Sequence, residues 1–123
     1  TAALSATVAC SVFFVEYAGI LGAVLPFDVQ SSATGTSTTP SSGTATTTWE
    51  RELVVGVCGH TSGTFTAGTG FTKQLVGAQI VSAYEDKFIQ TIGSNAATGT
   101  ISNTTWSICM ATFKARRVYD SNG

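Results

Sequence analysis

Charged residues are scarce in this chain of 123 residues, at 11% against a usual share of about 25%. The basic residues are scattered, apart from Lys114, Arg116 and Arg117, whereas a protein that reads nucleic acid normally carries a basic stripe. Since 43% of the residues are hydrophobic, the low charge does not indicate disorder, which combines low hydrophobicity with high charge. We therefore expect a folded protein with no nucleic-acid partner.

Helical patterning is missing as well, because no segment repeats apolar residues at the helical period over three turns. One apolar run, Val8–Phe27, has the length of a membrane span. Glu16 lies near its centre, which costs about 2.5–3.5 kcal/mol on insertion, and Pro26 closes the run. Its first half is rich in β-branched and aromatic residues. We therefore predict a strand here and no membrane span.

Serine, threonine and glycine take the place of the charged residues, and threonine packs well on a pleated sheet. Apolar segments alternate with turns rich in glycine and serine, a pattern typical of all-β proteins. We predict a single domain over residues 1–123, an all-β, antiparallel β-sandwich of jelly-roll-like form. The predicted strands are Ser5–Tyr17, Phe27–Gln30, Leu53–His60, Gln74–Val81, Ala83–Thr91 and Trp106–Lys114, with a Ser/Thr-rich hairpin or loop over Ser31–Trp49 and a frayed tail over 118–123.

Several short motifs follow one another along the chain. They are "FFVEYAG" (Phe13–Gly19), "ELVVGV" (Glu52–Val57), "FTAGTGFT" (Phe65–Thr72), "EDK" (Glu85–Lys87), "AATGTIS" (Ala96–Ser102) and "ATFKA" (Ala111–Ala115). Their succession resembles a family of secreted bacterial and phage-associated β-sandwich domains with a jelly-roll, lectin-like form. The resemblance covers nearly the whole chain. It implies the same fold and a location outside the cell, at the cell surface or on a virion.

The resemblance also implies that part of the sandwich is missing. In that family the strand similar to Phe13–Gly19 lies near the middle of the domain, whereas here it lies close to the first residue. The N-terminal half of the sandwich is then absent, which leaves an apolar sheet face and open strand edges. Self-association covers such surfaces. We therefore expect a homo-oligomer, either a dimer or a fibre joined through open strand edges.

One histidine is present, His60, two residues after Cys58 on the same face of a predicted strand. A small hydrolase would use Cys58 or a serine as nucleophile, His60 as base and Glu85 or Asp86 as its acid partner. However, side chains at positions i and i+2 of a strand point in parallel and do not converge. We therefore favour a strand end at a turn for His60 and keep the hydrolase as an alternative.

Three cysteines, Cys10, Cys58 and Cys109, each lie inside an apolar run. Buried free thiols are the favoured interpretation, and a disulfide between two of them is an alternative. A zinc site would need four ligands, which all three cysteines and His60 would have to supply from different strands. The sequence shows no closely spaced cysteine pair, so the metal site is the weaker hypothesis, and we expect no cofactor.

Aromatic residues offer a further candidate site, because exposed rings in lectin-like sandwiches stack against sugars. Trp49 and Tyr84 are the candidate ligand-binding residues for a glycan, although core packing is the commoner use of such rings. We conclude that the sequence predicts a non-catalytic structural, assembly or binding module. A hydrolase centred on His60 and a carbohydrate-binding module are the alternatives.

Overall fold

The computed structural model describes residues 12–22, 25–76 and 81–116, and over these residues the protein is all-β. No helix of this part of the chain is long and apolar enough to cross a membrane. The strands are β1 (Phe27–Ser37), β2 (Ala45–Thr46), β3 (Glu52–His60), β4 (Thr66–Ala67), β5 (Thr72–Val76), β6 (Ser82–Ile89), β7 (Ser94–Asn95), β8 (Gly99–Thr100) and β9 (Thr104–Lys114). The predicted all-β, antiparallel class is confirmed.

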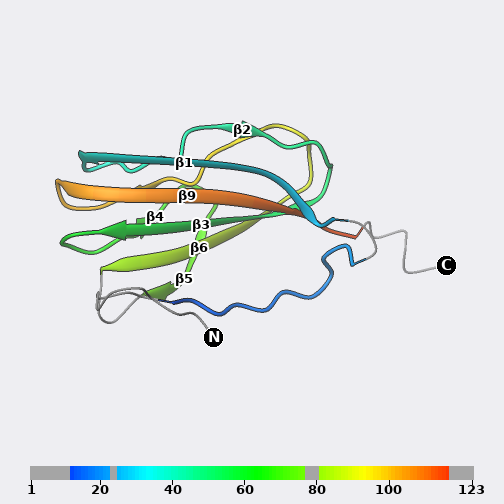
Figure 1. The fold of residues 1–123 in the computed structure, drawn as a ribbon, viewed down its shortest axis with the longest axis horizontal. Coiled ribbons are helices and arrows are strands. Elements are labelled where there is room, and N and C mark those ends of the chain that lie inside the picture. Colours follow the sequence, from blue (N-terminus) through cyan, green and yellow to red (C-terminus); the bar gives the residue numbers. More distant parts are fainter. Residues whose placement is uncertain (1–11, 23–24, 77–80, 117–123) are drawn as a thin grey trace, which may run out of the picture.

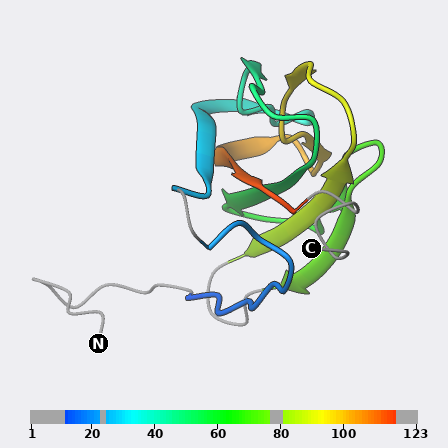
Figure 2. The same cartoon turned by 90° about the vertical axis from the view of Figure 1, so that its right-hand side faces the viewer.

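The main sheet has five strands in the order β1-β9-β3-β6-β5, and every neighbouring pair is antiparallel (Figure 1). Its centre, β3, corresponds to the predicted strand Leu53–His60, and its neighbour β9 corresponds to the predicted strand Trp106–Lys114. Two further sheets, β2-β7 and β4-β8, have two strands each. They and their loops lie on one side of the main sheet (Figure 2).

The hydrophobic core lies between the main sheet and these small sheets. Side chains at alternate positions of β3 and β9 enter it, among them Val54, Cys58, Ile108 and Met110, each no more than 2% exposed. Phe65, Ala97 and Ile101 come from the covering loops. We call this side of the main sheet the covered face.

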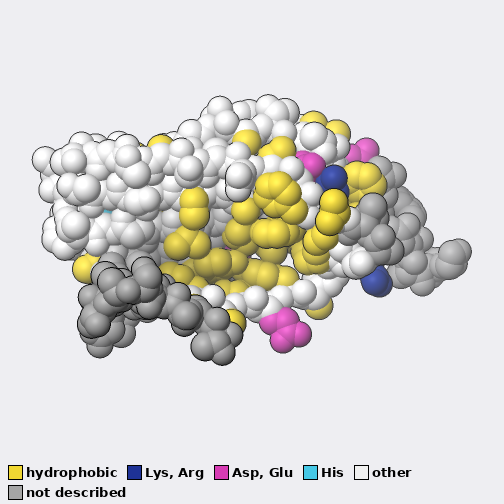
Figure 3. Space-filling view, in the orientation of Figure 1, with side chains coloured by type: hydrophobic (Ala, Val, Ile, Leu, Met, Phe, Trp, Pro, Cys, Tyr) yellow, Lys and Arg dark blue, Asp and Glu magenta, His cyan; other side chains and the backbone are white. Residues whose placement is uncertain are grey.

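The opposite side of the main sheet, which we call the open face, has no second sheet over it among the described residues. Its side chains come from the remaining alternate positions of the same strands, and the strand registers place them in rows across the sheet. Three neighbouring rows contribute apolar side chains: Phe27, Phe113, Leu53 and Phe88 in the first, Ala111 and Val55 in the second, and Cys109, Val57 and Tyr84 in the third. The two rows beyond them contain Thr34, Ser107, Gly59 and Ser82, and then Thr36 and Thr105. Apolar side chains gather over one part of the surface, and the other end of the strands is polar (Figure 3).

The predicted strand Ser5–Tyr17 is wrong over residues 12–17, and its first residues lie outside the described part of the chain. Residues 12–17 belong to no strand. They run across the open face as an extended segment (Figures 1 and 2). We call residues Val12–Leu21 the strap. Apolar residues follow one another along this segment, but they do not form a strand, because no neighbouring strand pairs with its backbone.

The Ser/Thr-rich region, predicted as a hairpin or loop, forms no hairpin within itself. Over Ser31–Ser37 it continues β1, which forms one edge of the main sheet, and β2 pairs with β7 and not with β1. The predicted strand Gln74–Val81 overlaps β5, which covers Thr72–Val76. Residues 77–80 of that prediction and the predicted tail at 118–123 lie outside the described residues.

Candidate functional site

The strap is held against the open face by one polar anchor. The hydroxyl of Tyr17 donates a hydrogen bond to the carboxylate of Asp86 on β6 and lies 3.0 Å from the hydroxyl of Tyr84. The ring of Phe13 packs beside Tyr84, with ring centroids 6.2 Å apart. Gln74 on β5 donates to the second oxygen of Asp86 at 2.9 Å. Both carboxylate oxygens of Asp86 are therefore satisfied, which permits its burial on an apolar surface.

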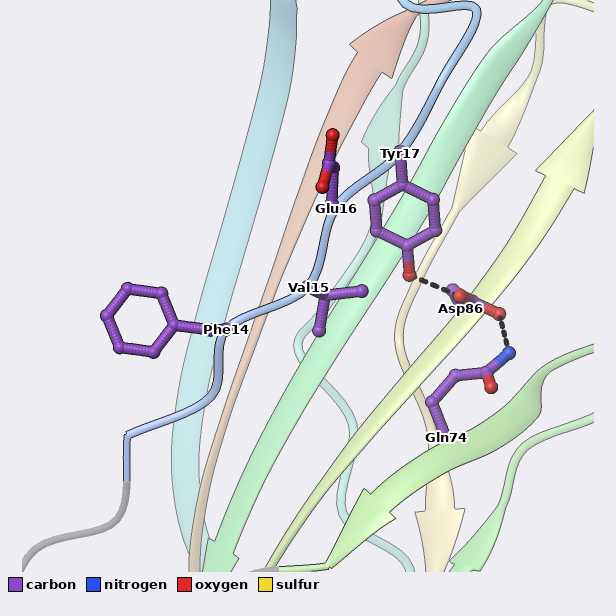
Figure 4. Close-up of a pocket in the computed structure, with 6 residues that line it drawn as sticks. All are labelled: Phe14, Val15, Glu16, Tyr17, Gln74 and Asp86. Atoms are coloured by element: carbon purple, nitrogen blue, oxygen red, sulfur yellow. Dashed lines mark hydrogen bonds between the residues drawn. The ribbon is translucent and has the colours of Figure 1, made fainter.

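A shallow hollow of about 390 Å³ lies where the strap crosses β5 and β6. Phe14, Val15 and Glu16 line it together with the hydrogen-bonded group of Tyr17, Gln74 and Asp86. Tyr17 points toward Asp86, whereas Phe14 and Glu16 point away from it (Figure 4). The polar atoms at the floor of the hollow are already paired with one another. They are arranged to hold the strap and are not free to bind a small molecule.

The tyrosine hydroxyls of this anchor remain protonated at neutral pH. Burial, and hydrogen bonds with Asp86 and Tyr84, raise the pKa of Tyr17 above its usual value. Burial likewise raises the pKa of Tyr84. Both groups are therefore hydrogen-bond donors at physiological pH, and neither is poised to act as a base or nucleophile.

The base of the strap is fixed to the end of β9. Ile20 forms an isolated antiparallel bridge with Ala115. The N–H of Leu21 donates to the carbonyl of Lys114 at 3.0 Å, and the N–H of Arg116 donates to the carbonyl of Gly19 at 2.9 Å. Gly19 has a φ of +81°, a conformation that favours glycine, and it turns the chain onto the open face. The strap is thus held at two points, its base and Tyr17.

A polar cluster beside the strap base joins the ends of β1, β3 and β9. The ammonium of Lys114 lies 3.3 Å from Asp28. Burial raises the pKa of Asp28, but hydrogen bonds from Thr48 and the ion pair with Lys114 outweigh it and hold this pKa at about 2. Burial raises the pKa of Glu52, and the Asp28 carboxylate raises it further. The cluster therefore pairs an Asp28 carboxylate whose pKa is lowered with a Glu52 carboxyl whose pKa is raised.

Glu85, the predicted acid partner of His60, is buried on the covered face at 1% exposure. One of its oxygens accepts from the N–H of Gly68 at 3.1 Å, and the other has no hydrogen-bond partner in the described structure. Burial raises the pKa of Glu85 to about 7. Gly56 lies against the Glu85 side chain and leaves no room for a larger residue: a Cβ at position 56 would be 2.7 Å from Ala97 and 3.0 Å from Glu85.

Glu85 and Asp86 point to opposite faces of β6. Neither carboxylate is solvated, because Glu85 is 1% exposed and Asp86 is 8% exposed. Loops cover the first and the strap covers the second. Glu16, which would have been a buried charge in a central strand, is exposed to solvent instead.

The proposed catalytic residues are not arranged for nucleophilic chemistry. His60 is 4% exposed, its Nδ1 donates to the carbonyl of Ser62 at 2.9 Å, and its ring packs beside Phe65. Cys58 is buried in the core, and burial raises the pKa of its thiol to about 12. A thiol with that pKa is not a nucleophile at neutral pH. His60 is instead the last residue of β3, at the start of a turn, as the sequence predicts.

The candidate metal ligands are separated by the sheet. Cys58 and His60 are on the covered face, whereas Cys109 is on the open face and exposed. Cys10 lies outside the described residues. Among the residues that the structure describes, no group of three or more histidine, cysteine or acidic side chains is arranged to hold a metal ion. Cys58 and Cys109 are both free thiols, and the exposure of Cys109 contradicts its predicted burial.

The two candidate sugar-stacking rings do not form a platform. Tyr84 is 7% exposed and lies beneath the strap. Trp49 is half-buried, and its indole N–H donates to the carbonyl of Ala115 at 3.2 Å. The most exposed aromatic ring of the described residues is Phe14, at 92%. The sequence did not single out Phe14, because its alternating apolar neighbours predicted a buried strand.

Comparison with known proteins returns no match: no family model, no curated protein and no solved structure is similar to this chain. The functional argument therefore depends on the geometry of the open face and its strap.

Proposed function

We propose that this protein is a non-catalytic assembly module, and that the apolar rows of the open face are its binding surface for a second copy of the same chain. The observation that carries the proposal is the asymmetry of the main sheet. One face is closed by two small sheets, and the other is crossed by a single extended segment. Motif similarity to secreted β-sandwich domains supports the proposal and favours an extracellular or virion-surface location.

Three phenylalanine side chains around the open face are exposed to solvent. Phe14, Phe27 and Phe88 are 92%, 45% and 50% exposed, and together they leave on the order of 300–400 Å² of ring surface in water. The largest apolar patch on a monomer is about 300–600 Å² and is often a binding site. Burying a phenylalanine contributes about 1.5–3 kcal/mol, which offsets part of the free-energy cost of association.

A second copy matches this surface in chemistry. The charged side chain within the apolar rows, Asp86, is already bound by Tyr17 and Gln74. The Asp86 carboxylate therefore already has hydrogen-bond partners, so two such surfaces related by a twofold axis meet without an unsatisfied carboxylate at their centre. A highly charged or nucleic-acid partner has nothing to pair with there.

The test is a pair of arginine substitutions read by light scattering at micromolar concentration. Cys109→Arg introduces a charge in the middle of the open face, where the exposed side chain leaves room for it. Thr44→Arg introduces the same charge beside β2, and Thr44 is exposed there. We expect the first variant to be monomeric and the second to associate like the unmodified chain. If the two variants have the same mass as the unmodified chain, the open face is not the binding surface.

A further inference from the structure

We infer that Glu85 is the sensor of a pH-operated latch on the covered face: as a neutral carboxyl it holds the turn at residues 68–71 against the main sheet, and as a carboxylate it releases that turn. Such a latch needs a buried titratable group, a contact from this group to a movable segment, and no counter-charge that would keep the group ionised in the closed state. It concerns the covered face and is independent of association through the open face.

Glu85 is buried where the main sheet meets the loops that cover it. Its side chain is 1% exposed, and its unpartnered oxygen, Oε1, lies 3.0 Å from the position that a Cβ would take at Gly56 on β3. Ala97, which is 0% exposed, closes the same spot from the loop side, 2.7 Å from that position. A carboxylate here keeps one buried oxygen without a hydrogen bond, which disfavours the charged form.

The other carboxyl oxygen joins Glu85 to the turn. Oε2 accepts the N–H of Gly68 at 3.1 Å, and the N–H of Phe71 donates to the carbonyl of Gly68 at 3.0 Å, which closes the turn. Only glycine fits at position 68, since a Cβ there would lie 2.2 Å from the hydroxyl oxygen of Thr98. Gly68 therefore contacts both the carboxyl and the neighbouring loop, so that a change in the carboxyl acts directly on the turn.

The two lysines that face Glu85 are bound elsewhere. Lys87, two residues along β6, has its ammonium over the ring of Phe71, 4.5 Å from the centroid. Lys73, opposite Glu85 on β5, donates to the carbonyl of Phe65 at 3.0 Å. Among the described residues, neither lysine forms an ion pair with Glu85. The charge of an ionised Glu85 is thus not neutralised in the closed state.

The other titratable group that faces Glu85 is the thiol of Cys58 on β3. Burial, and the nearby Glu85, raise the pKa of this thiol to about 12, so it stays neutral while Glu85 titrates. The backbone N–H groups of Gly68 and Thr98 and the charge of Lys87 favour the ionised form of Glu85, but burial outweighs them and raises its pKa to about 7. The carboxyl therefore changes its charge across neutral pH.

The turn is the covering segment that gives way when Glu85 ionises. The loop segment beside it is hydrogen-bonded along its far side to residues 38–42, through Ala97, Gly99 and Ile101. The turn lacks such a second neighbour among the described residues: it follows the two-residue strand β4, and Thr69 and Gly70 within it are exposed. Segments with few buried contacts open at the lowest free energy. A rise in pH through neutrality thereby loosens the cover of the core and leaves the main sheet intact.

The test is the order of individual backbone amides, measured by NMR relaxation in the unmodified chain at about pH 5.5 and about pH 8. We expect the order parameters of Gly68 and Thr69 to fall from about 0.85 to below about 0.6 as the pH is raised. Gly99 and Ile101, whose N–H groups bond to residues 38–42, are the internal controls and should keep the higher value at both pH values. An unchanged turn, or an equal loss of order at Gly99 and Ile101, would overturn the inference.

Glu85→Gln is the matched variant, because glutamine keeps the size of the side chain and an oxygen for the Gly68 N–H but does not ionise. Its turn should stay ordered at both pH values, and a loss of order like that of the unmodified chain would contradict the role assigned to Glu85. The side-chain carboxyl of Glu85 in the unmodified chain gives a second measurement that does not need the variant. Its ¹³C shift should titrate with a midpoint near 7, together with the change at Gly68. A midpoint below about 5, as in an ordinary glutamate, would overturn the latch.

Discussion

The two faces of the main sheet are built from alternate residues of the same strands, yet they differ in what covers them. On the covered face, Val54, Ile108 and Met110 are at most 2% exposed beneath loops and small sheets. On the open face, Cys109 is exposed, and Phe27 and Phe88 remain about half exposed. Apolar side chains of the covered face hold the chain together, whereas several of those on the open face remain in contact with solvent.

The largest expected effect comes from neighbouring residues of β9 that face opposite ways. Ile108→Ala removes buried side chain from the core and is expected to lower the free energy of unfolding by about 2–5 kcal/mol. Cys109→Ala, one residue along, is expected to change it by less than about 0.5 kcal/mol. Both are measured by urea unfolding at protein concentrations low enough that association does not contribute. Comparable losses would mean that the two faces do not differ in this way.

A second effect depends on pH and concerns the covered face. The pKa of Glu85 is about 7 in the folded chain and 4.5 in its ordinary state. The folded state therefore binds more protons between these values, so the contribution of Glu85 to stability is complete below pH 4.5 and is lost as the pH rises through 7. The expected loss is on the order of 3 kcal/mol. Glu85→Gln should flatten this slope in urea unfolding at a series of pH values, and an unchanged slope would show that another group titrates.

A third and smaller effect concerns the open face. Tyr17→Phe removes the hydroxyl that binds Asp86 and is expected to destabilise the docked strap by about 1.5–3 kcal/mol, a typical value for a hydrogen bond to a charged group. Proteolysis within the strap should become faster, while urea unfolding of the sheet changes little. A loss of global stability as large as that of Ile108→Ala would place the strap in the core and would blur the distinction between the two faces.

Most of the fold could be predicted because its signals are local. The alternating valines of β3 and the apolar residues of β9 are where the sequence placed strands. The strap could not be predicted, because Phe13–Tyr17 carries the same apolar alternation as a central strand. Whether such a segment becomes a strand depends on neighbours that pair with its backbone, and the segment's own residues do not reveal them.

The candidate site was harder to predict than the fold. Tyr17 and Asp86 are 69 residues apart in the chain, and no local pattern announces their hydrogen bond. The sequence directed attention to Cys58 and His60, which are rare residue types two positions apart but are used for core packing and for ending a strand. The exposure of Phe14 has no sequence signal either, because its apolar neighbours predict a buried strand.

The mass of the unmodified protein at sedimentation equilibrium tests the central claim most directly. A single chain has a mass of 12.6 kDa. With the open face bound to a second copy, we expect twice this mass at micromolar concentration, reverting to the single-chain mass on dilution or in the Cys109→Arg variant. A mass of 12.6 kDa at every concentration up to the limit of solubility would contradict the account.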